Sequence, residues 1–403
     1  MSPIRLGFVG LSATGWASYT LVPPLLEEPL SSKYTLTAVS TTNPTSASAC
    51  AEKYSKLTSA PVKAYHGSTE QIANDPNVDM VAVSVRTPAH VDAALPVLRA
   101  KKSLFVEWPA GMHLAGTNEL AETAKKNGVR TLVGFQTRQA AYVKKASTCF
   151  QEGRPWVDLG SRSKRFLTQE FWVESSRHLW YVYGLSNASA LAEHCDQIAS
   201  LYFPGGRGPT GYEPYRYIYD VSNGTTMVDI DAGHITDMFH YLFGPIATVT
   251  AHLANQYPAV QLVDFSGKAV GEPIPQDDIH HVVFGGQFGN TDATALSVDI
   301  RNVLTEHGTG LFWVIDGERG TIKLRADGMK GQTFMKAQPE VWLNGEKLEV
   351  EMDTEAQRSA RSWSKFADGA EGEYPTLEDA VRAKRVVDAI FTSSREGRKV
   401  NLS

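Results

Sequence analysis

The feature that most constrains this chain is the strand and turn at its N-terminus. A short apolar run from Ile4 to Val9 stops at Gly10, and a stretch able to form a helix follows. Residues 10–15 read G-x-S-x-x-G, one substitution from the dinucleotide-binding fingerprint. In that fingerprint the small residues permit a tight turn, let backbone amides approach a pyrophosphate and let the helix pack on the strand. We therefore predict a cofactor-binding turn made of Gly10, Ser12, Ala13, Thr14 and Gly15.

Further apolar runs alternate with stretches of helical character. Strands are predicted over 34–40, 78–85, 104–106 and 131–135, with helices over 89–100 and 115–127. This alternation predicts an α/β fold with a doubly wound, parallel Rossmann sheet as an NAD(P)-binding domain over residues 1–150. Ligands of such sheets lie at the carboxyl ends of the strands. The sequence places six candidate cofactor-binding residues there: Arg86, Thr87, Pro88, His90, Glu107 and Gln136.

The end of the second predicted strand bears on the choice of cofactor. An acidic residue at this place holds the ribose 2′-hydroxyl of NAD(H), but this chain has Ser40, Thr41 and Thr42. Without a carboxylate, a 2′-phosphate is not repelled, and hydroxyl groups can donate to it. The sequence therefore favours NADP(H) over NAD(H).

The second half of the chain has a different pattern of predicted elements. Strands are predicted over 246–256, 279–288, 293–301, 311–315 and 321–325, and Asp316-Gly317 and Asn344-Gly345 are tight-turn signals. We expect an α+β domain over 151–375 with an open, mostly antiparallel sheet. A C-terminal helix and tail over 376–403, capped by Thr376, would return to the Rossmann domain. The composition of 353–373 predicts disorder.

One stretch of the second half carries candidate acid–base residues. Asp231, His234 and Asp237 are spaced three apart, so a helix would present them on one face. Histidine transfers protons near neutral pH, and a neighbouring carboxylate would orient it. The alternative is a histidine that only packs between domains. The absence of a further His or Cys cluster argues against a metal site.

Several motifs together resemble the Gfo/Idh/MocA family of oxidoreductases. They are GFVG near the start, Thr87-Pro88-Ala89-His90, Glu107-Trp108-Pro109, the GHITD that begins at Gly233, and SREGR near the end. The resemblance implies that a lysine between the glutamate and the proline, and a histidine on a later helix, flank the substrate beside the nicotinamide. His234 matches that histidine, but Trp108 replaces the lysine. The aspartate expected one turn before the histidine is displaced to Asp231.

Within that family, GFVGLSATGWA, LFVEW, YIYDVSNG and GHITD look like the fungal galactose-pathway repressor and its enzyme-like relatives. That repressor has the same fold, binds a nicotinamide dinucleotide, lacks the lysine and grips an activation domain. The resemblance therefore implies two different functions, a redox enzyme or a regulator with a protein partner.

The loss of the lysine leaves three interpretations, because an indole has one neutral N–H and cannot relay a proton. The chain is an oxidoreductase for an unusual small-molecule substrate, a non-catalytic dinucleotide-binding regulator, or an enzyme fold with a structural role. We favour the NAD(P)-dependent oxidoreductase. Its catalytic set would be His234, Asp231 and Trp108, and its substrate-binding set Trp108, Gln136, Tyr217, Tyr219 and His234.

Composition limits the partners and the compartment. The 403-residue chain is 42% hydrophobic and 21% charged, with a net charge of −5, and it has no long basic run, which argues against direct nucleic-acid binding. No apolar segment is long enough to cross a membrane. Three cysteines (Cys50, Cys149 and Cys195) are too few for a disulfide framework, so we expect a reducing, cytoplasmic environment. The open sheet predicts a homodimer.

Overall fold

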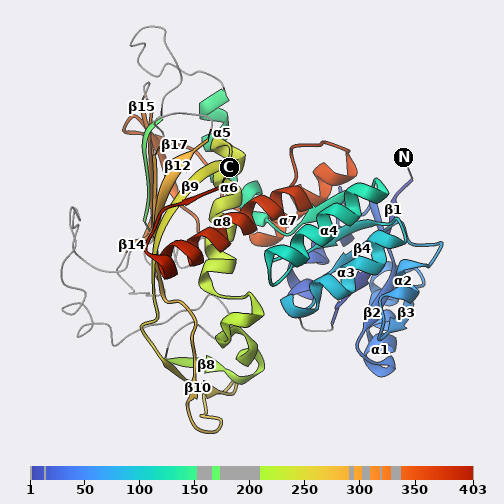
Figure 1. The fold of residues 1–403 in the computed structure, drawn as a ribbon. Helices are drawn as coiled ribbons and strands as arrows, with labels where there is room; N and C mark the ends of the chain where they lie inside the picture. The colour runs from blue at the N-terminus through green and yellow to red at the C-terminus, as the bar shows by residue number, and fades with distance from the viewer. Residues whose placement is uncertain are drawn as a thin grey trace.

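The computed structural model describes residues 2–12, 15–151, 166–172, 209–289, 295–301, 309–317, 320–327 and 337–402. These residues form two lobes, one around each of two large sheets, and the long helix α8 (Leu377–Glu396) runs from one lobe to the other (Figure 1). The α/β architecture predicted from the sequence is confirmed.

The N-terminal lobe is a Rossmann fold. Its parallel sheet has the strand order β3-β2-β1-β4-β5-β6, with helices packed against it. The order reverses between β1 and β4, which is the point where such sheets bind dinucleotides. The strands are β1 (Ile4–Val9), β2 (Tyr34–Thr41), β3 (Lys63–His66), β4 (Met80–Val83), β5 (Ser103–Val106) and β6 (Thr131–Val133), and the helices are α1 (Pro44–Thr58), α2 (Glu70–Ala73), α3 (His90–Arg99) and α4 (Leu114–Asn127).

The helix expected after the glycine turn is irregular. A π-helical turn, η1 (Ala17–Leu21), leads into a short 3₁₀ helix, η2 (Pro23–Leu26). Pro23 and Pro24 have no backbone N–H to donate to a longer α-helix, which accounts for the break. The cofactor side of this lobe therefore begins with a short, tightly wound segment.

The second lobe is built on a nine-stranded sheet of order β17-β16-β15-β14-β7-β13-β12-β9-β18. All its neighbours pair antiparallel except β7 and β13, which confirms the mostly antiparallel sheet. Its strands are β7 (Phe166–Trp172), β9 (Ile246–Ala254), β12 (His281–Phe288), β13 (Ala295–Arg301), β14 (Thr309–Gly317), β15 (Gly320–Asp327), β16 (Glu340–Leu343), β17 (Glu346–Leu348) and β18 (Val400–Asn401).

Helices α5 (Ala141–Gln151) and α6 (Gly233–Phe243) belong to this lobe, and α6 and α8 pack against each other. A small three-stranded sheet of β8 (Thr210–Tyr212), β10 (Ala259–Val263) and β11 (Ile274–Pro275) lies at one end (Figure 1). Between these elements run the short helical turns η3 (Thr87–Ala89), η4 (Gln136–Gln139), η6 (Glu213–Tyr219), η7 (Val221–Asn223) and η8 (Val228–Ala232).

Helix α7 (Glu355–Ala367) corrects the prediction of disorder over 353–373, which is wrong. Thr354 and Gln357 form a capping box at its start. Trp363 is fully buried and stacks on Phe105 of β5, with ring centroids 4.7 Å apart. The polar composition of this stretch belongs to the outer face of an amphipathic helix, whose apolar face covers the Rossmann core.

Helix α8 ties the two lobes together. Its capping box of Thr376 and Asp379 is present as predicted, and the backbone N–H of Leu377 donates to Thr131 Oγ1 over 3.1 Å. Near its other end the Ser393 hydroxyl accepts from the Ala251 N–H of β9 over 2.9 Å. The same helix therefore contacts both sheets.

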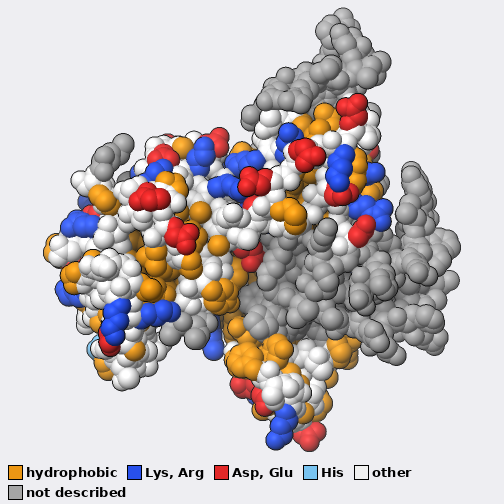
Figure 2. Space-filling model, turned by 180° about the vertical axis from the view of Figure 1, so that it is seen from behind, with side chains coloured by type: hydrophobic (Ala, Val, Ile, Leu, Met, Phe, Trp, Pro, Cys, Tyr) orange, Lys and Arg blue, Asp and Glu red, His pale blue; other side chains and the backbone are white. Residues whose placement is uncertain are grey.

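Other sequence-based expectations concern surface and thiols. In the part of the chain that the structure describes, no helix is both long and apolar enough for a membrane span. Cys50 and Cys149 are buried free thiols, and Cys195 lies outside the described residues. Acidic and basic side chains are intermixed on the described part of one face (Figure 2).

Candidate functional site

The turn after β1 has the geometry of a dinucleotide cradle. Gly10 has a φ of +85°, and a Cβ there would stand 2.2 Å from the Ser84 carbonyl oxygen, so no other residue fits. The Ser12 hydroxyl accepts the backbone N–H of Gly15 over 2.7 Å, so it stabilises the turn from within. Ala13 and Thr14 lie outside the described residues.

At the end of β2, not all of the hydroxyl groups that were expected to face a cofactor are exposed. Ser40 is buried, at 1% exposure, so its side chain does not face a ligand at the sheet edge. The Thr41 hydroxyl lies 2.6 Å from that of Ser46, while Thr42 is exposed. His66, which the sequence reading missed, is the register partner of Thr41 on β3 and is exposed. Thr42 and His66 are therefore exposed side chains at this end of β2 and β3.

The side chains of the segment after β4 differ in their exposure to solvent. Arg86 is exposed, whereas Thr87 is buried and Pro88 is half-buried. His90 is buried, with Nδ1 2.7 Å from the Pro109 carbonyl and Nε2 2.9 Å from the Val85 carbonyl. Burial lowers the pKa of His90, so the neutral ring donates its one N–H to one of these two carbonyls. The ring therefore packs between two loops, and its role in cofactor binding stays a prediction.

Glu107 lies at the carboxyl end of β5 and is held from two sides. The Trp16 indole N–H donates to its Oε1 over 3.0 Å, and the Gln136 amide donates to its Oε2 over 3.1 Å. A Cβ on Gly134 would stand 2.0 Å from the same carboxylate, so glycine is required beside it. Removal from water raises the pKa of Glu107 to about 7, against these two hydrogen bonds. Trp16, 91 positions away in sequence, was not predicted as a site residue.

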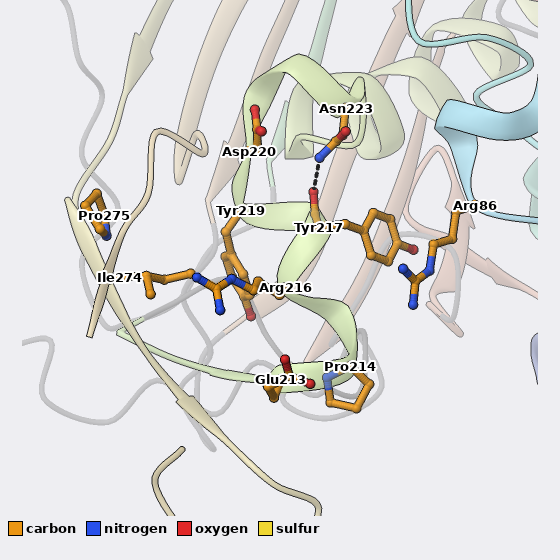
Figure 3. A pocket seen from close by; sticks show the side chains of 10 residues that line it. All are labelled: Arg86, Glu213, Pro214, Arg216, Tyr217, Tyr219, Asp220, Asn223, Ile274 and Pro275. Carbon is orange, nitrogen blue, oxygen red and sulfur yellow. Dashed lines mark hydrogen bonds between the residues drawn. The ribbon is translucent and has the colours of Figure 1, made fainter. Parts of the chain in front are cut away.

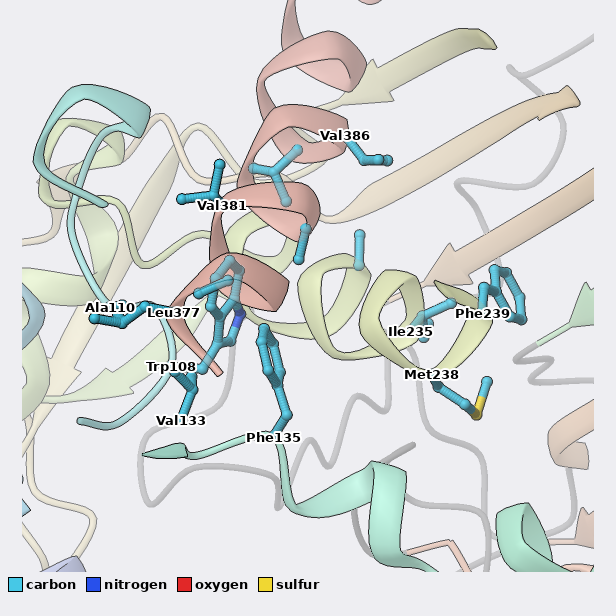
Figure 4. Packing of buried hydrophobic residues seen from close by; sticks show 14 of the residues in the cluster. Trp108, Ala110, Val133, Phe135, Ile235, Met238, Phe239, Leu377, Val381 and Val386 are labelled. Atoms are coloured by element: carbon cyan, nitrogen blue, oxygen red, sulfur yellow. The ribbon is translucent and has the colours of Figure 1, made fainter. Parts of the chain in front are cut away.

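Trp108 fills the position at which the family resemblance places a lysine. Its indole N–H donates to the Asp229 carbonyl over 2.8 Å, and its ring lies against Phe135 with centroids 4.5 Å apart (Figure 4). A Cβ on Gly233 would meet the indole at 2.5 Å, so the backbone of α6 also packs on the ring. Trp108 is therefore a buried core residue whose one donor is already used.

His234 lies on the other side of Phe135, with ring centroids 5.5 Å apart in an edge-to-face arrangement. It is 4% exposed, and its Nδ1 has no hydrogen-bond partner. Burial lowers its pKa to about 3, so the imidazole is neutral at physiological pH and is not a ready proton donor.

The expected pairing of His234 with a carboxylate is not found among the described residues. Asp231 belongs to η8 and not to the helix that carries His234, because the chain winds as a π-turn up to Ala232. Asp237 instead accepts from Arg138 Nε over 3.0 Å. The predicted dyad is thus replaced by a neutral histidine and a separate ion pair.

A pocket of about 740 Å³ opens beside Arg86 (Figure 3). The Arg86 guanidinium lies over the Tyr217 ring, 4.9 Å from its centroid. Tyr219 is buried beneath, and Asn223 donates to the Tyr217 carbonyl over 2.7 Å, which fixes the 3₁₀ segment. The lining side chains are Arg86, Glu213, Pro214, Arg216, Tyr217, Tyr219, Asp220, Asn223, Ile274 and Pro275.

The structure thus groups the predicted substrate residues into two places. Tyr217 and Tyr219 line the pocket with Arg86, whereas Trp108 and His234 pack in the interior around Phe135 and do not line it. Arg216, which no motif singled out, joins the pocket. Among the described residues no cluster of His, Cys, Asp or Glu could hold a metal ion.

Comparison with known proteins agrees with this geometry. The model of the Gfo/Idh/MocA family, described as an oxidoreductase family with an NAD-binding Rossmann fold, matches residues 4–135. Residues 4–135 thus form an NAD-binding domain of the Gfo/Idh/MocA type. A second model, described as the Gal80p C-terminal domain, matches residues 203–326.

Relatives of this chain include a protein described as a dehydrogenase and one described as a regulatory protein. It is 28% identical over 408 residues to dehydrogenase aclE of Aspergillus oryzae, covering 98% of this chain and 97% of the relative. It is 25% identical over 341 residues to the galactose/lactose metabolism regulatory protein GAL80 of Saccharomyces cerevisiae, covering 81% of this chain and 67% of that protein.

Solved structures share the fold across the whole chain. A super-repressor mutant of Gal80p from Saccharomyces cerevisiae has a TM-score of 0.80 at 22% identity, covering 100% of this chain and 98% of that one. An NAD binding oxidoreductase from Klebsiella pneumoniae has a TM-score of 0.72 at 17% identity, with both chains covered in full. These likenesses support the fold and leave function to the site.

Proposed function

We propose that the chain is an NAD(P)-dependent oxidoreductase whose small-molecule substrate binds in the Arg86–Tyr217 pocket. The observation that carries this proposal is that pocket: one of its lining residues is Arg86, which lies three residues after the end of β4, at the sheet edge where a dinucleotide lies in a Rossmann fold. The full-length correspondence to a protein described as a dehydrogenase supports the same conclusion.

The residues present fit a nicotinamide dinucleotide. Gly10, with a φ of +85°, forms the tight turn after β1 that such a cofactor requires, and the bound cofactor would accept or deliver a hydride at its nicotinamide ring. We assign the phosphate region to Gly10, Ser12 and Gly15, and the nicotinamide side to the ends of β4 and β5. NADP(H) is preferred over NAD(H), because Thr42 and His66 rather than a carboxylate are exposed at the end of β2.

Arg86 supplies a positive charge, which Trp108 cannot supply. It is exposed and makes no ion pair with any described residue, so its guanidinium is available to a substrate oxygen that gathers negative charge. Tyr217 holds the guanidinium from one face. The aromatic and apolar half of the lining favours a substrate with a ring or short apolar body, and the charged and polar half can bind its oxygen atoms. The substrate class is therefore a carbonyl compound or its alcohol, with an apolar body.

A second candidate is a dinucleotide-binding regulator without catalysis. The specific observation in its favour concerns the two positions at which the family's catalytic residues usually lie. The Trp108 N–H there donates to the Asp229 carbonyl, and the buried His234 is neutral. Similarity to GAL80 over 81% of the chain points the same way. In this alternative the pocket would hold a segment of a protein partner.

The test follows the absorbance of NADPH and NADH against a panel of aldehydes, ketones and enones, and of NADP⁺ and NAD⁺ against the corresponding alcohols. The proposal predicts turnover of at least one aromatic or apolar member. No turnover of any member, together with dinucleotide binding by calorimetry, would overturn the enzyme and leave the regulator.

A further inference from the structure

Glu107 is a carboxylate on the nicotinamide side of the cofactor edge. In a sheet of this strand order the first three strands hold one mononucleotide half and β4 to β6 hold the other. The glycine turn and the end of β2 belong to the adenosine half, so the end of β5 faces the nicotinamide half. Glu107 follows β5 directly.

The surroundings of Glu107 hold its carboxylate in one place without neutralising it. The two groups that bond to it, Trp16 and Gln136, are uncharged donors. The charged group that acts on it from a packed element is Glu355 of α7, which has the same sign and adds to the effect of burial in raising the pKa of Glu107. Helix α7 packs on η1 and η4, which brings Glu355 to this edge.

An oxidised nicotinamide ring carries a positive charge and a reduced ring carries none, while the phosphates and riboses are the same in both. A fixed carboxylate beside the ring therefore stabilises the oxidised form selectively.

We infer that Glu107, held in place by Trp16 and Gln136, makes this protein bind the oxidised nicotinamide dinucleotide in preference to the reduced one. The inference rests on the proposed cofactor site. Because the oxidised form binds more tightly, the bound reduced form is a stronger reductant than in solution, so reduction of a carbonyl compound on the protein is favoured over oxidation of the alcohol.

Calorimetry tests it with the oxidised and the reduced form of whichever dinucleotide binds more tightly. The ratio of the two dissociation constants should favour the oxidised form in the wild type. Glu107→Gln, which keeps the size of the side chain and one of its two acceptor oxygens, should shift that ratio toward the reduced form by about tenfold. Glu122→Gln, an exposed change on α4, is the matched control and should leave the ratio unchanged.

A second variant and a pH series distinguish an electrostatic effect of Glu107 from a loss of structure in Glu107→Gln. Glu355→Gln removes a like charge and should lower the pKa of Glu107, so near pH 7 it should shift the ratio toward the oxidised form by a smaller factor. In the wild type the preference should weaken from about pH 8 to about pH 6, as Glu107 takes up a proton, and it should not change with pH in Glu107→Gln.

Two results would overturn the inference. One is an equal ratio in the wild type and in both glutamine variants. The other is a loss of affinity for both forms by the same factor in Glu107→Gln. Failure of the proposed function gives a different result. If the protein is not an enzyme, no turnover is found while the ratio of dissociation constants still shifts. If neither form of the dinucleotide binds, both the proposed function and this inference are wrong.

Discussion

Gly10 and Gly67 both have positive φ angles, +85° and +75°, but their surroundings differ. A Cβ at Gly10 would stand 2.2 Å from the Ser84 carbonyl, whereas a Cβ at Gly67 meets nothing within 4 Å. Gly67→Ala should therefore cost about 1 kcal/mol from backbone strain alone. Gly10→Ala should cost on the order of 3 kcal/mol or more. Urea denaturation measures both, and equal losses would contradict the crowded turn.

Trp108 gives a second prediction at the residue scale. Trp108→Lys puts an ammonium group among Phe135 and Gly233, and it should destabilise the protein by about 3–5 kcal/mol rather than restore a catalytic lysine. Trp108→Phe keeps an aromatic ring and loses the bond to the Asp229 carbonyl, at a cost of about 1–3 kcal/mol. Similar unfolding midpoints for the two variants would show that the position is not a closed interior.

Single positions also show what the sequence could predict. Gly10 was predictable because a turn between strand and helix has a strict steric rule. The burial of Ser40 depends on which face of β2 it occupies, and the hydrogen bond from Trp16 to Glu107 joins residues that share no local pattern. Spacing predicted the Asp231–His234 dyad, but a π-turn before α6 changes the rotation between the two residues.

At the scale of elements, α6 carries two buried histidines whose pKa values are lowered to about 3, His234 and His240. An unfolded histidine has a pKa of about 6.5. Between these values the unfolded chain binds more protons, so the free energy of unfolding falls as the pH is lowered through that window. His234→Asn should reduce this slope by up to about 1.4 kcal/mol per pH unit. The exposed His252→Asn is the control, and equal slopes in both variants would contradict the buried neutral imidazole.

Helix α8 is joined to η8 by a buried ion pair. Lys384 Nζ lies 2.6 Å from Asp229 Oδ1, and both side chains are 3% exposed. Lys384→Met leaves a buried carboxylate unpaired and should cost about 3–5 kcal/mol, and adding Asp229→Asn should recover part of that loss. Denaturation of the two single variants and the double variant forms the cycle. Additive losses would mean that the pair is not coupled.

The strands with continuous apolar runs were more predictable from the sequence than the amphipathic helix α7. The apolar runs that became β1 and β2 needed no long-range information, and the Asn344-Gly345 signal forms its turn, with φ angles of 53° and 87°. Helix α7 was missed because small and polar residues dominate its sequence, while its stability comes from Trp363 and Phe366 packing against distant strands.

For the whole molecule we expect a homodimer through the nine-stranded sheet. Val283 of β12 is 37% exposed, and its register partner His252 is also exposed, so this sheet face carries solvent-facing positions. Light scattering at micromolar concentration should give about twice the chain mass of 44.1 kDa. Val283→Lys should lower the mass, and Phe265→Lys, at a distant site that is 69% exposed, should not. A single-chain mass for the wild type would contradict this expectation.

The central claim is that the chain performs redox chemistry in the Arg86–Tyr217 pocket and not against Trp108. The direct measurement is the steady-state rate of nicotinamide oxidation or reduction, with the best substrate of the panel, in wild type, Arg86→Met and Trp108→Phe. The account predicts a loss of about 10²-fold in Arg86→Met and a change of less than about threefold in folded Trp108→Phe. A rate that survives in Arg86→Met and collapses in Trp108→Phe would contradict it.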